Sequence, residues 1–281
     1  MANSSTLKTF LGTTEAGPLI IVPVTRDSLA LAVTTLVQTD AGTFRFPRVS
    51  ADPTAAWTAE NAEIAVSEAT ADEVVVTPRK IAGLSIVSNE LANDTSPEAA
   101  QVIGDALARD IAKGIDRAFF GTAPANTTIQ PGGLEYLATA VTTITANPAV
   151  GIEAFIDALA AAESFGVTLD SFITDPATAA ALAKLTTGSG SNLPLFGVGA
   201  ANGIERAILG VPLLVSPSVI AGTAWGIPKA SVFSVLRNDV TLDIDKSAYF
   251  SKDQTAIRAI LRVAFGFVQP EAIIKIKAAT V

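Results

Sequence analysis

The sequence predicts an α+β protein whose surface is built for contact with other protein chains. Strand-like runs alternate with one long helical pattern over Glu98–Phe120, and a long polar excursion separates two of the strands between residues 55 and 80. In addition, 49% of the residues are hydrophobic and only 16% are charged. This balance leaves more apolar surface than a monomer keeps exposed, so we assign the excess to subunit contacts.

The composition excludes most catalytic chemistry. The chain has 281 residues, which allows one large or two modest domains with ample core. It contains no His and no Cys, which excludes disulfides, imidazole or thiolate metal sites, Cys nucleophiles and a Ser–His–Asp triad. Carboxylate-dependent catalysis is the enzymatic alternative that remains. We predict no catalytic residue, no cofactor and no metal.

Neither a membrane nor nucleic-acid recognition fits the pattern of charge and hydropathy. The most apolar runs, such as Leu19–Val24 and Ala207–Val215, are far shorter than the roughly 20 residues of a spanning helix. No basic segment precedes an apolar one at the N-terminus, so no secretory signal is predicted. The net charge is −8 and no basic stripe is present, although an acidic lining suits a container for DNA.

The order of elements begins with a polar arm over Met1–Thr14. Residues 28–36 are apolar enough for a helix or a strand, and periodicity does not decide between them. Three helices are predicted, over Glu98–Phe120, Glu153–Phe165 and Pro176–Leu185. Ser96 and Pro97 are start signals for the first helix, which Gly121 ends, and Asp175 is the start signal for the third. The predicted strands are Leu19–Val24, Gly42–Val49, Val74–Val76, Ile81–Val87, Ser171–Thr174, Ile208–Val215, Ser231–Leu236, Val240–Ile244 and Ala256–Phe267.

Several short motifs recur in an order that resembles one known family. They are Trp57-x-x-Glu60, Ser88-Asn89-Glu90-Leu91, Phe119-Phe120-Gly121, Pro131-Gly132-Gly133-Leu134, a Leu209-Gly210-x-Pro212 turn within the strand 208–215, and the closing Pro270-Glu271-Ala272-Ile273-Ile274-Lys275. Each motif alone is weak, but together they span Val24–Lys277. The chain is similar to tailed-bacteriophage major capsid proteins of the Hong Kong 97-type fold.

This resemblance implies a division of the chain and a function. It implies an N-terminal arm (1–30), the start of a peripheral domain (31–54), an extended loop (55–80), the peripheral domain with its spine helix (81–149), an axial domain (150–235) and return strands (236–281). The expected function is self-assembly into hexamers and pentamers of an icosahedral head around double-stranded DNA, without sequence-specific binding. The expected setting is the virion, assembled in the bacterial host cytoplasm with a scaffold, a portal and a cement protein.

Two alternatives to a phage capsid stay open at this point. An encapsulin-type nanocompartment shell shares the fold but encloses enzymes. A carboxylate-dependent enzyme belongs to a different class, and turnover that is lost on changing Glu60 or Asp243 would indicate it.

The extended loop supplies the residues that we expect at subunit interfaces: Trp57, Glu60, Glu63, Glu68, Arg79 and Lys80. We expect Trp57 to pack against the core or against a neighbouring subunit. The irregular spacing of the carboxylates favours a solvated face, or pairing with a neighbour's cations, over a metal or glycosidase cluster. Arg79 and Lys80 are either an exposed turn or salt-bridge partners for a neighbour.

Two further segments have a functional and a simpler interpretation. Gly197–Gly203 superficially suggests a dinucleotide loop, but no βαβ unit or ribose-binding acid accompanies it. The resemblance places this loop at the capsomer centre, with Gly188, Gly190, Asn192 and Gly199 as its marker residues. A calcium site at Asp243, Asp245 and Asp253 lacks the required loop pattern, which favours solvated turn charges.

Some members of the resembled family join their subunits covalently, through a loop Lys, an Asn and a Glu seven residues further on. Asp253 stands at the matching Asn position and Ile260 at the Glu position, and no Lys occurs between Trp57 and Thr77. The resemblance therefore implies shells that are held noncovalently. Members often carry an N-terminal scaffolding segment; because Met1 precedes the arm directly, we expect a separate scaffold or assembly without one.

Overall fold

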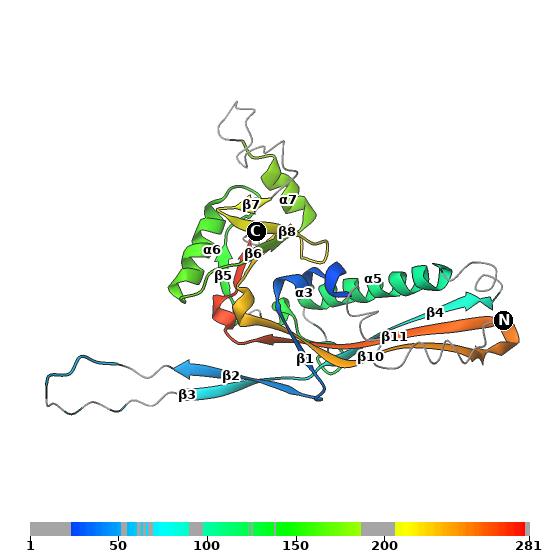
Figure 1. Ribbon diagram of the computed structural model, residues 1–281. Coiled ribbons are helices and arrows are strands. Elements are labelled where there is room, and N and C mark those ends of the chain that lie inside the picture. The colour runs from blue at the N-terminus through cyan, green and yellow to red at the C-terminus, as the bar shows by residue number, and fades with distance from the viewer. Residues whose placement is uncertain are drawn as a thin grey trace.

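The computed structural model describes residues 24–51, 55–60, 63, 66, 70–89, 98–122, 124, 126–137, 139–186 and 206–278. Within these ranges the chain forms a four-stranded sheet, a six-stranded sheet and a two-stranded ribbon that projects from the body (Figure 1). The predicted combination of helices and sheets is therefore confirmed. The helices lie on the sheets and leave the ribbon bare.

The four-stranded sheet is built around two long antiparallel strands. Its order is β1-β10-β11-β4, with β1 parallel to β10 and the other neighbours antiparallel. The sequence predicted separate strands at 231–236 and 240–244, but they form one strand with a register irregularity between Arg237 and Thr241. The bounds are β1 Thr35–Thr39, β4 Arg79–Ser88, β10 Val232–Tyr249 and β11 Gln254–Phe267.

Helix α5 has the predicted bounds, Glu98–Phe120, and covers one face of this sheet. It has 23 residues, so it is about 34 Å long. Its buried face reaches the sheet through Phe119, whose ring centroid lies 4.9 Å from that of Phe265 in an edge-to-face arrangement. A Cβ atom at Gly114 would come within 2.6 Å of Ile81 Cδ1, so glycine permits the close approach of helix and strand. The predicted start signals Ser96 and Pro97 lie outside the described residues.

Residues 28–36, which the sequence left undecided, form a short helix followed by a strand. Ser28 caps α3 (Leu29–Val33) by accepting a hydrogen bond from the backbone N–H of Leu31, and β1 begins two residues after the helix ends. Val24 and Ala30 are fully buried in the core under α5. The folded body therefore already includes residue 24, earlier than the predicted arm boundary at residue 30.

The six-stranded sheet has the order β5-β12-β9-β6-β8-β7. The two predicted helices α6 (Glu153–Ser164) and α7 (Pro176–Ala183) are confirmed, and the Asp175 carboxylate caps α7 by accepting from the N–H of Ala177 at 3.0 Å and of Thr178 at 3.1 Å. The strand bounds are β5 Thr142–Thr145, β6 Ser171–Thr174, β7 Ala207–Ile208, β8 Val211–Val215, β9 Thr223–Ile227 and β12 Ile274–Lys277.

The predicted strand 208–215 is divided at its Leu209-Gly210 turn motif. Leu209 and Gly210 have positive φ angles of 53° and 83° and make a tight turn, so β7 and β8 form a hairpin. The motif marks the turn correctly, although a leucine stands where asparagine is usual.

The two sheets exchange strands through short 3-10 segments. β9 continues through η2 (Lys229–Ser231) into β10, and β11 continues through η4 (Pro270–Ala272) into β12. β5 and β12 are therefore parts of the six-stranded sheet, although the sequence-based division grouped them with the other layer. The assignment of the two layers to a peripheral and an axial domain stays a prediction. The remaining 3-10 turns are η1 Leu134–Leu137 and η3 Phe250–Lys252.

Candidate assembly interface

The most distinctive feature of the molecule is the ribbon of β2 (Phe44–Ala51) and β3 (Thr70–Val76), which with its connecting segment we call the arm. The two strands are antiparallel, with Phe44 opposite Val76 and Ala51 opposite Thr70. The arm leaves the body at one end and extends away from both sheets (Figure 1). The two predicted strands are confirmed, and the predicted long excursion connects them.

The base of the arm is anchored by aromatic packing on the face of the four-stranded sheet opposite α5. The Phe46 ring is 7% exposed, and its centroid lies 4.6 Å from that of Phe233 on β10. A Cβ atom at Gly266 on β11 would lie only 2.6 Å from Phe46 Cε2, so a glycine makes room for the ring. Val76 and Val235 complete this small core. The direction in which the arm leaves the subunit therefore depends on these apolar contacts.

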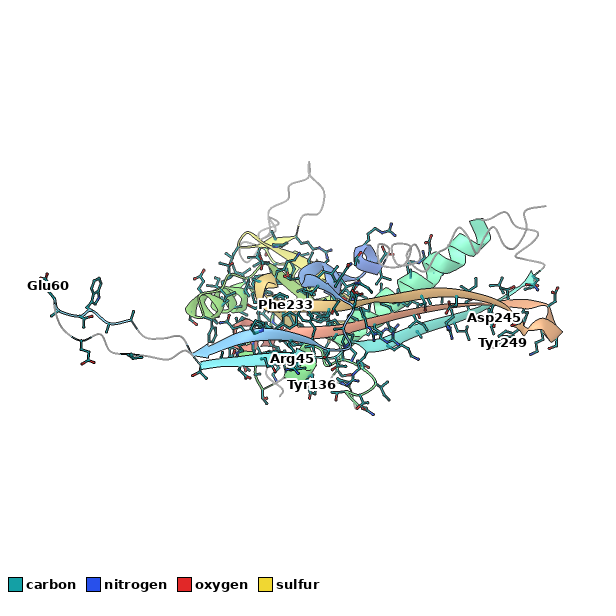
Figure 2. The ribbon with its side chains drawn as sticks, turned by 60° about the horizontal axis from the view of Figure 1, so that its bottom comes forward. Arg45, Glu60, Tyr136, Phe233, Asp245 and Tyr249 are labelled. Atoms are coloured by element: carbon teal, nitrogen blue, oxygen red, sulfur yellow. The ribbon has the colours of Figure 1, made fainter. Side chains whose placement is uncertain are left out.

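Ion pairs add to this anchor. Arg48 Nη2 lies 3.3 Å from Glu271 Oε1 and connects β2 to η4, at the joint between the two sheets. Arg45 pairs with Glu73 across the ribbon (Figure 2). Both pairs are partly exposed, so each contributes only about 0–1 kcal/mol.

The outer part of the arm makes no use of its own subunit's core. Trp57 is fully exposed, at 106% of its reference area, and Val66 is 92% exposed. Figure 2 shows Glu60 at the far end of the arm. The expectation that Trp57 packs against its own core is wrong, because β2 ends at Ala51 and Trp57 lies beyond the paired strands. Its packing against a neighbouring subunit stays a prediction.

The other predicted interface residues have different positions. Glu60 and Glu63 are exposed, as expected for a solvated loop, whereas Glu68 lies outside the described residues. Arg79 and Lys80 do not form a turn, since both belong to β4 and pair with Val263 and Arg262 of β11. The capsomer-centre residues Gly188, Gly190, Asn192 and Gly199 also lie outside the described residues.

Lys80 belongs to a row of cations that crosses the sheet. Lys80 is opposite Arg262, and Arg262 is opposite Arg237, so the three side chains occupy one face of three adjacent strands. This face is the one on which the arm's base packs, and it also carries Leu84 and Ile86, which are 58% and 44% exposed. We call it the outer sheet face. Sequence inspection missed it, because only the pairing register brings these residues together.

The carboxylates near the β10–β11 turn do not form a metal site. Asp243 pairs with Arg258 at 2.6 Å, Asp245 accepts a hydrogen bond from the Ser247 hydroxyl, and Asp253 accepts one from Asn89 Nδ2 at 2.7 Å. Each carboxylate therefore has its own partner. In the described part of the chain, no three His, Cys, Asp or Glu residues are grouped to hold a metal, and no helix is long and apolar enough to cross a membrane.

A two-layer α+β subunit with a long covering helix and an anchored, outward-pointing arm defines the class of shell-forming proteins with the Hong Kong 97-type fold. Residues 13–278 match the model of the phage capsid family, and the chain belongs to that family. A sequence search of curated proteins gave no match.

Solved structures support the same conclusion about the fold. A chain from Microbacterium phage Oxtober96 has a TM-score of 0.73 and 21% identity, over 90% of this chain and 91% of that one. One from Mycobacterium phage Bobi has a TM-score of 0.73 and 19% identity, over 90% and 91%. The capsid of a native GTA particle has a TM-score of 0.68 and 18% identity, over 92% and 90%. The predictions of the fold and of a major capsid protein are confirmed.

Proposed function

We propose that this major capsid protein assembles noncovalently into hexamers and pentamers of an icosahedral head, and that the arm holds neighbouring subunits together. The observation that carries this proposal is the fully exposed Trp57 beyond the end of an anchored ribbon. Burial of an indole side chain is strongly favourable in free energy, and within the described residues of this subunit Trp57 packs on nothing. A second subunit can supply that surface.

The outer sheet face supports this role through complementary charge. The arm carries Glu60 and Glu63 in its exposed part, and residues 49–78 contain no Lys or Arg. The outer sheet face presents the exposed Lys80 beside exposed Leu84 and Ile86. Each exposed ion pair is worth only about 0–1 kcal/mol. Because every subunit repeats the contact, the sum favours the closed shell while the monomer is little affected.

The cross-linking position supports noncovalent assembly. The Asp253 carboxylate is engaged by Asn89, and Ile260, which stands at the position of the family's catalytic Glu, has no ionisable group. The chain also lacks a Lys in the outer arm that such a reaction needs. The proposed role is accordingly structural and not enzymatic.

The remaining parts of the proposal concern contents and partners. A net charge of −8 disfavours tight contact with DNA, so the shell encloses double-stranded DNA without reading its sequence. Assembly takes place in the bacterial host cytoplasm, with a scaffold as a further partner. A portal and a cement protein are the expected further partners.

The test is a shortened arm. Residues 52–69 are replaced by a short Gly-Ser turn, so that β2 and β3 stay joined and the core around Phe46 and Val76 is kept. We expect a soluble subunit with unchanged circular dichroism that no longer forms closed particles in electron microscopy and sedimentation. The matched control is Arg45→Ala/Glu73→Ala, which removes an exposed ion pair but keeps the arm's length. Normal particles from the shortened protein would refute the role of the arm.

A further inference from the structure

Helix α6 presents an unusual outward face. Its exposed positions include Ile156 and Ala160 at the centre, flanked by Glu153, Asp157 and Glu163. We call these five residues the acidic face. None of the three carboxylates has a hydrogen bond or ion pair with the described residues.

The charges of the acidic face are poorly placed for an isolated subunit. Glu153 and Asp157 are four residues apart on one helix, a spacing at which like charges repel. No Lys or Arg occurs in the chain between Arg117 and Lys184, so the local sequence supplies no counter-charge. The centre of the face is apolar, since Ile156 is 46% exposed. The face therefore has the composition of a contact surface whose cations come from elsewhere.

The β7–β8 hairpin presents the opposite character. Arg206 and Lys184 are exposed and form no ion pair with the described residues; Glu205 directly precedes Arg206, and no further acidic residue occurs before Asp239. We call Arg206, Lys184 and the turn residue Leu209 the basic edge. Figure 1 shows α7, which ends just before Lys184, beside β7 and β8.

Leu209 adds an exposed apolar side chain to the basic edge at a cost to the subunit. Its φ angle is 53°, in the left-handed region that leucine rarely adopts, and the side chain is 53% exposed. A two-residue turn with positive φ at both positions is best served by Asn-Gly. A strained, exposed leucine at this position gains nothing within its own subunit, which points to a contact outside it.

The two surfaces are different parts of the six-stranded layer. Helix α6 packs on β12 and β5, at one end of the strand order, and β7 is the edge strand at the other end. A contact between two different surfaces of identical chains is a head-to-tail contact, and such contacts close into rings when the rotation permits. The acidic face and the basic edge are complementary in charge, and each carries an exposed apolar side chain.

We infer that the acidic face of one copy of this chain binds the basic edge of the next, with Leu209 packed against Ile156. This inference rests on the proposed self-assembly and names which surfaces of the six-stranded layer carry it within a ring of subunits. It is independent of the arm.

Charge reversal tests the contact. The basic edge is reversed with Lys184→Glu/Arg206→Glu, and the acidic face with Glu153→Lys/Asp157→Lys. Like-charge contacts oppose association, so we expect each variant to raise the concentration needed for assembly by about tenfold or more. The four changes together restore opposite charges at every contact, and we expect assembly within about threefold of the parent. Lys113→Glu, at an exposed position of α5, is a control for charge reversal outside the proposed contact and should assemble normally.

A mixing experiment distinguishes this contact from an effect of net charge. In an equimolar mixture of the two reversed variants, complementary contacts form only when the variants alternate around a ring. Alternation closes in a ring of six but not in a ring of five. We therefore expect the mixture to form hexamers or sheets of hexamers, but no closed shells.

A third variant needs no change of charge. Leu209→Asn places a favoured residue in the turn, so the isolated subunit should be at least as resistant to thermal unfolding as the parent. The same variant should assemble less well, because the contact with Ile156 is lost. If Leu209 had only a structural role, Leu209→Asn would not weaken assembly while thermal stability is kept or raised.

The possible failures can be told apart. If the parent forms no particles, the proposed function fails, and the same variants are compared by the association of subunits in sedimentation equilibrium. If single-surface variants associate as the parent does, or if the fourfold variant shows no rescue, the inference is overturned while the capsid function stands. Assembly that is lost equally in Lys113→Glu would also overturn it.

Discussion

The ammonium group of Lys275 lies 2.7 Å and 2.6 Å from the two carboxylate oxygens of Glu135. The two side chains are only 11% and 12% exposed, and Lys275 Nζ is 5.0 Å from the centre of the Trp225 ring. Lys275 belongs to β12 and Glu135 to η1, the turn that follows α5 and leads to β5. The pair thus neutralises a buried charge on the C-terminal strand and connects it to the segment beyond the long helix.

Removing one partner of this pair should destabilise the subunit strongly. Glu135→Ala leaves the Lys275 ammonium buried without a counter-charge, and we expect the free energy of unfolding to fall by about 3–5 kcal/mol. The double variant Glu135→Leu/Lys275→Met should lose much less than the sum of the single changes. Urea denaturation of the parent, Glu135→Leu, Lys275→Met and the double variant measures this coupling, and additive losses would show that the pair is energetically unimportant.

Phe46 and Trp57 should have opposite effects on the subunit. Phe46 is buried against Phe233 and Gly266, so Phe46→Ala should lower the free energy of unfolding by about 3–5 kcal/mol. Trp57→Ala should change it by no more than about 0.5 kcal/mol, because the indole is fully exposed. Thermal and urea unfolding of the unassembled subunits compare them. A large loss of stability in Trp57→Ala would mean that the indole packs within its own subunit.

Asp116 should give the subunit a pH-dependent contribution to stability. Burial raises the pKa of Asp116 above its ordinary value of 3.8, while hydrogen bonds from the Ala30 N–H, the Ser28 hydroxyl and the Leu29 N–H lower it in part. Because the folded pKa is raised, this group's contribution is fully present below the unfolded pKa. It is lost as the pH rises from about 3.8 through the folded value.

The measurement for Asp116 is a difference between two proteins. The free energy of unfolding of the parent minus that of Asp116→Asn should be largest at acidic pH and should decrease as the pH rises. Because both proteins share all other carboxylates, the difference removes the general effect of acid. A difference that grows with pH would indicate that the hydrogen bonds outweigh burial and that the folded pKa is lowered.

Mature particles should dissolve to single chains in hot detergent. Ile260 and Asp253 cannot provide the Glu and Asn that the family's cross-link uses, and residues 58–76 contain no Lys. A denaturing gel of boiled particles should show one band near 28.8 kDa. A ladder of multimers would prove that covalent joining occurs by another route.

The sequence predicted the elements whose signals are local. Helix α5 shows its period over 23 residues, and Asp175-Pro176 is a start signal that needs no tertiary context. The secondary structure of residues 28–36 could not be decided from the sequence. This short segment begins as a helix and ends in a strand, so its apolar residues follow no single period. The run 208–215 was predicted as one strand with a Leu-Gly turn motif, and the structure shows that this turn divides the run into the two paired strands β7 and β8.

Features that depend on the pairing of strands far apart in the chain could not be predicted from the sequence. The pairing of β12 with β5 and β9, and the alignment of Lys80, Arg262 and Arg237, arise from strand register between segments far apart in the chain. Trp57 was expected to pack against the core or against a neighbouring subunit, because it was placed at the base of the extended loop. Only the structure shows that the strands end before it.

The most direct test of the central claim uses the two tryptophans, since Trp57 is fully exposed and Trp225 fully buried in the subunit. In Trp225→Phe protein all tryptophan fluorescence comes from Trp57, and quenching by acrylamide is compared between dissociated subunits and purified particles. If the arm packs on a neighbour, Trp57 is quenched readily in the subunit and is protected, with a blue-shifted emission, in the particle. Equal quenching in both states would contradict the assembly role of the arm.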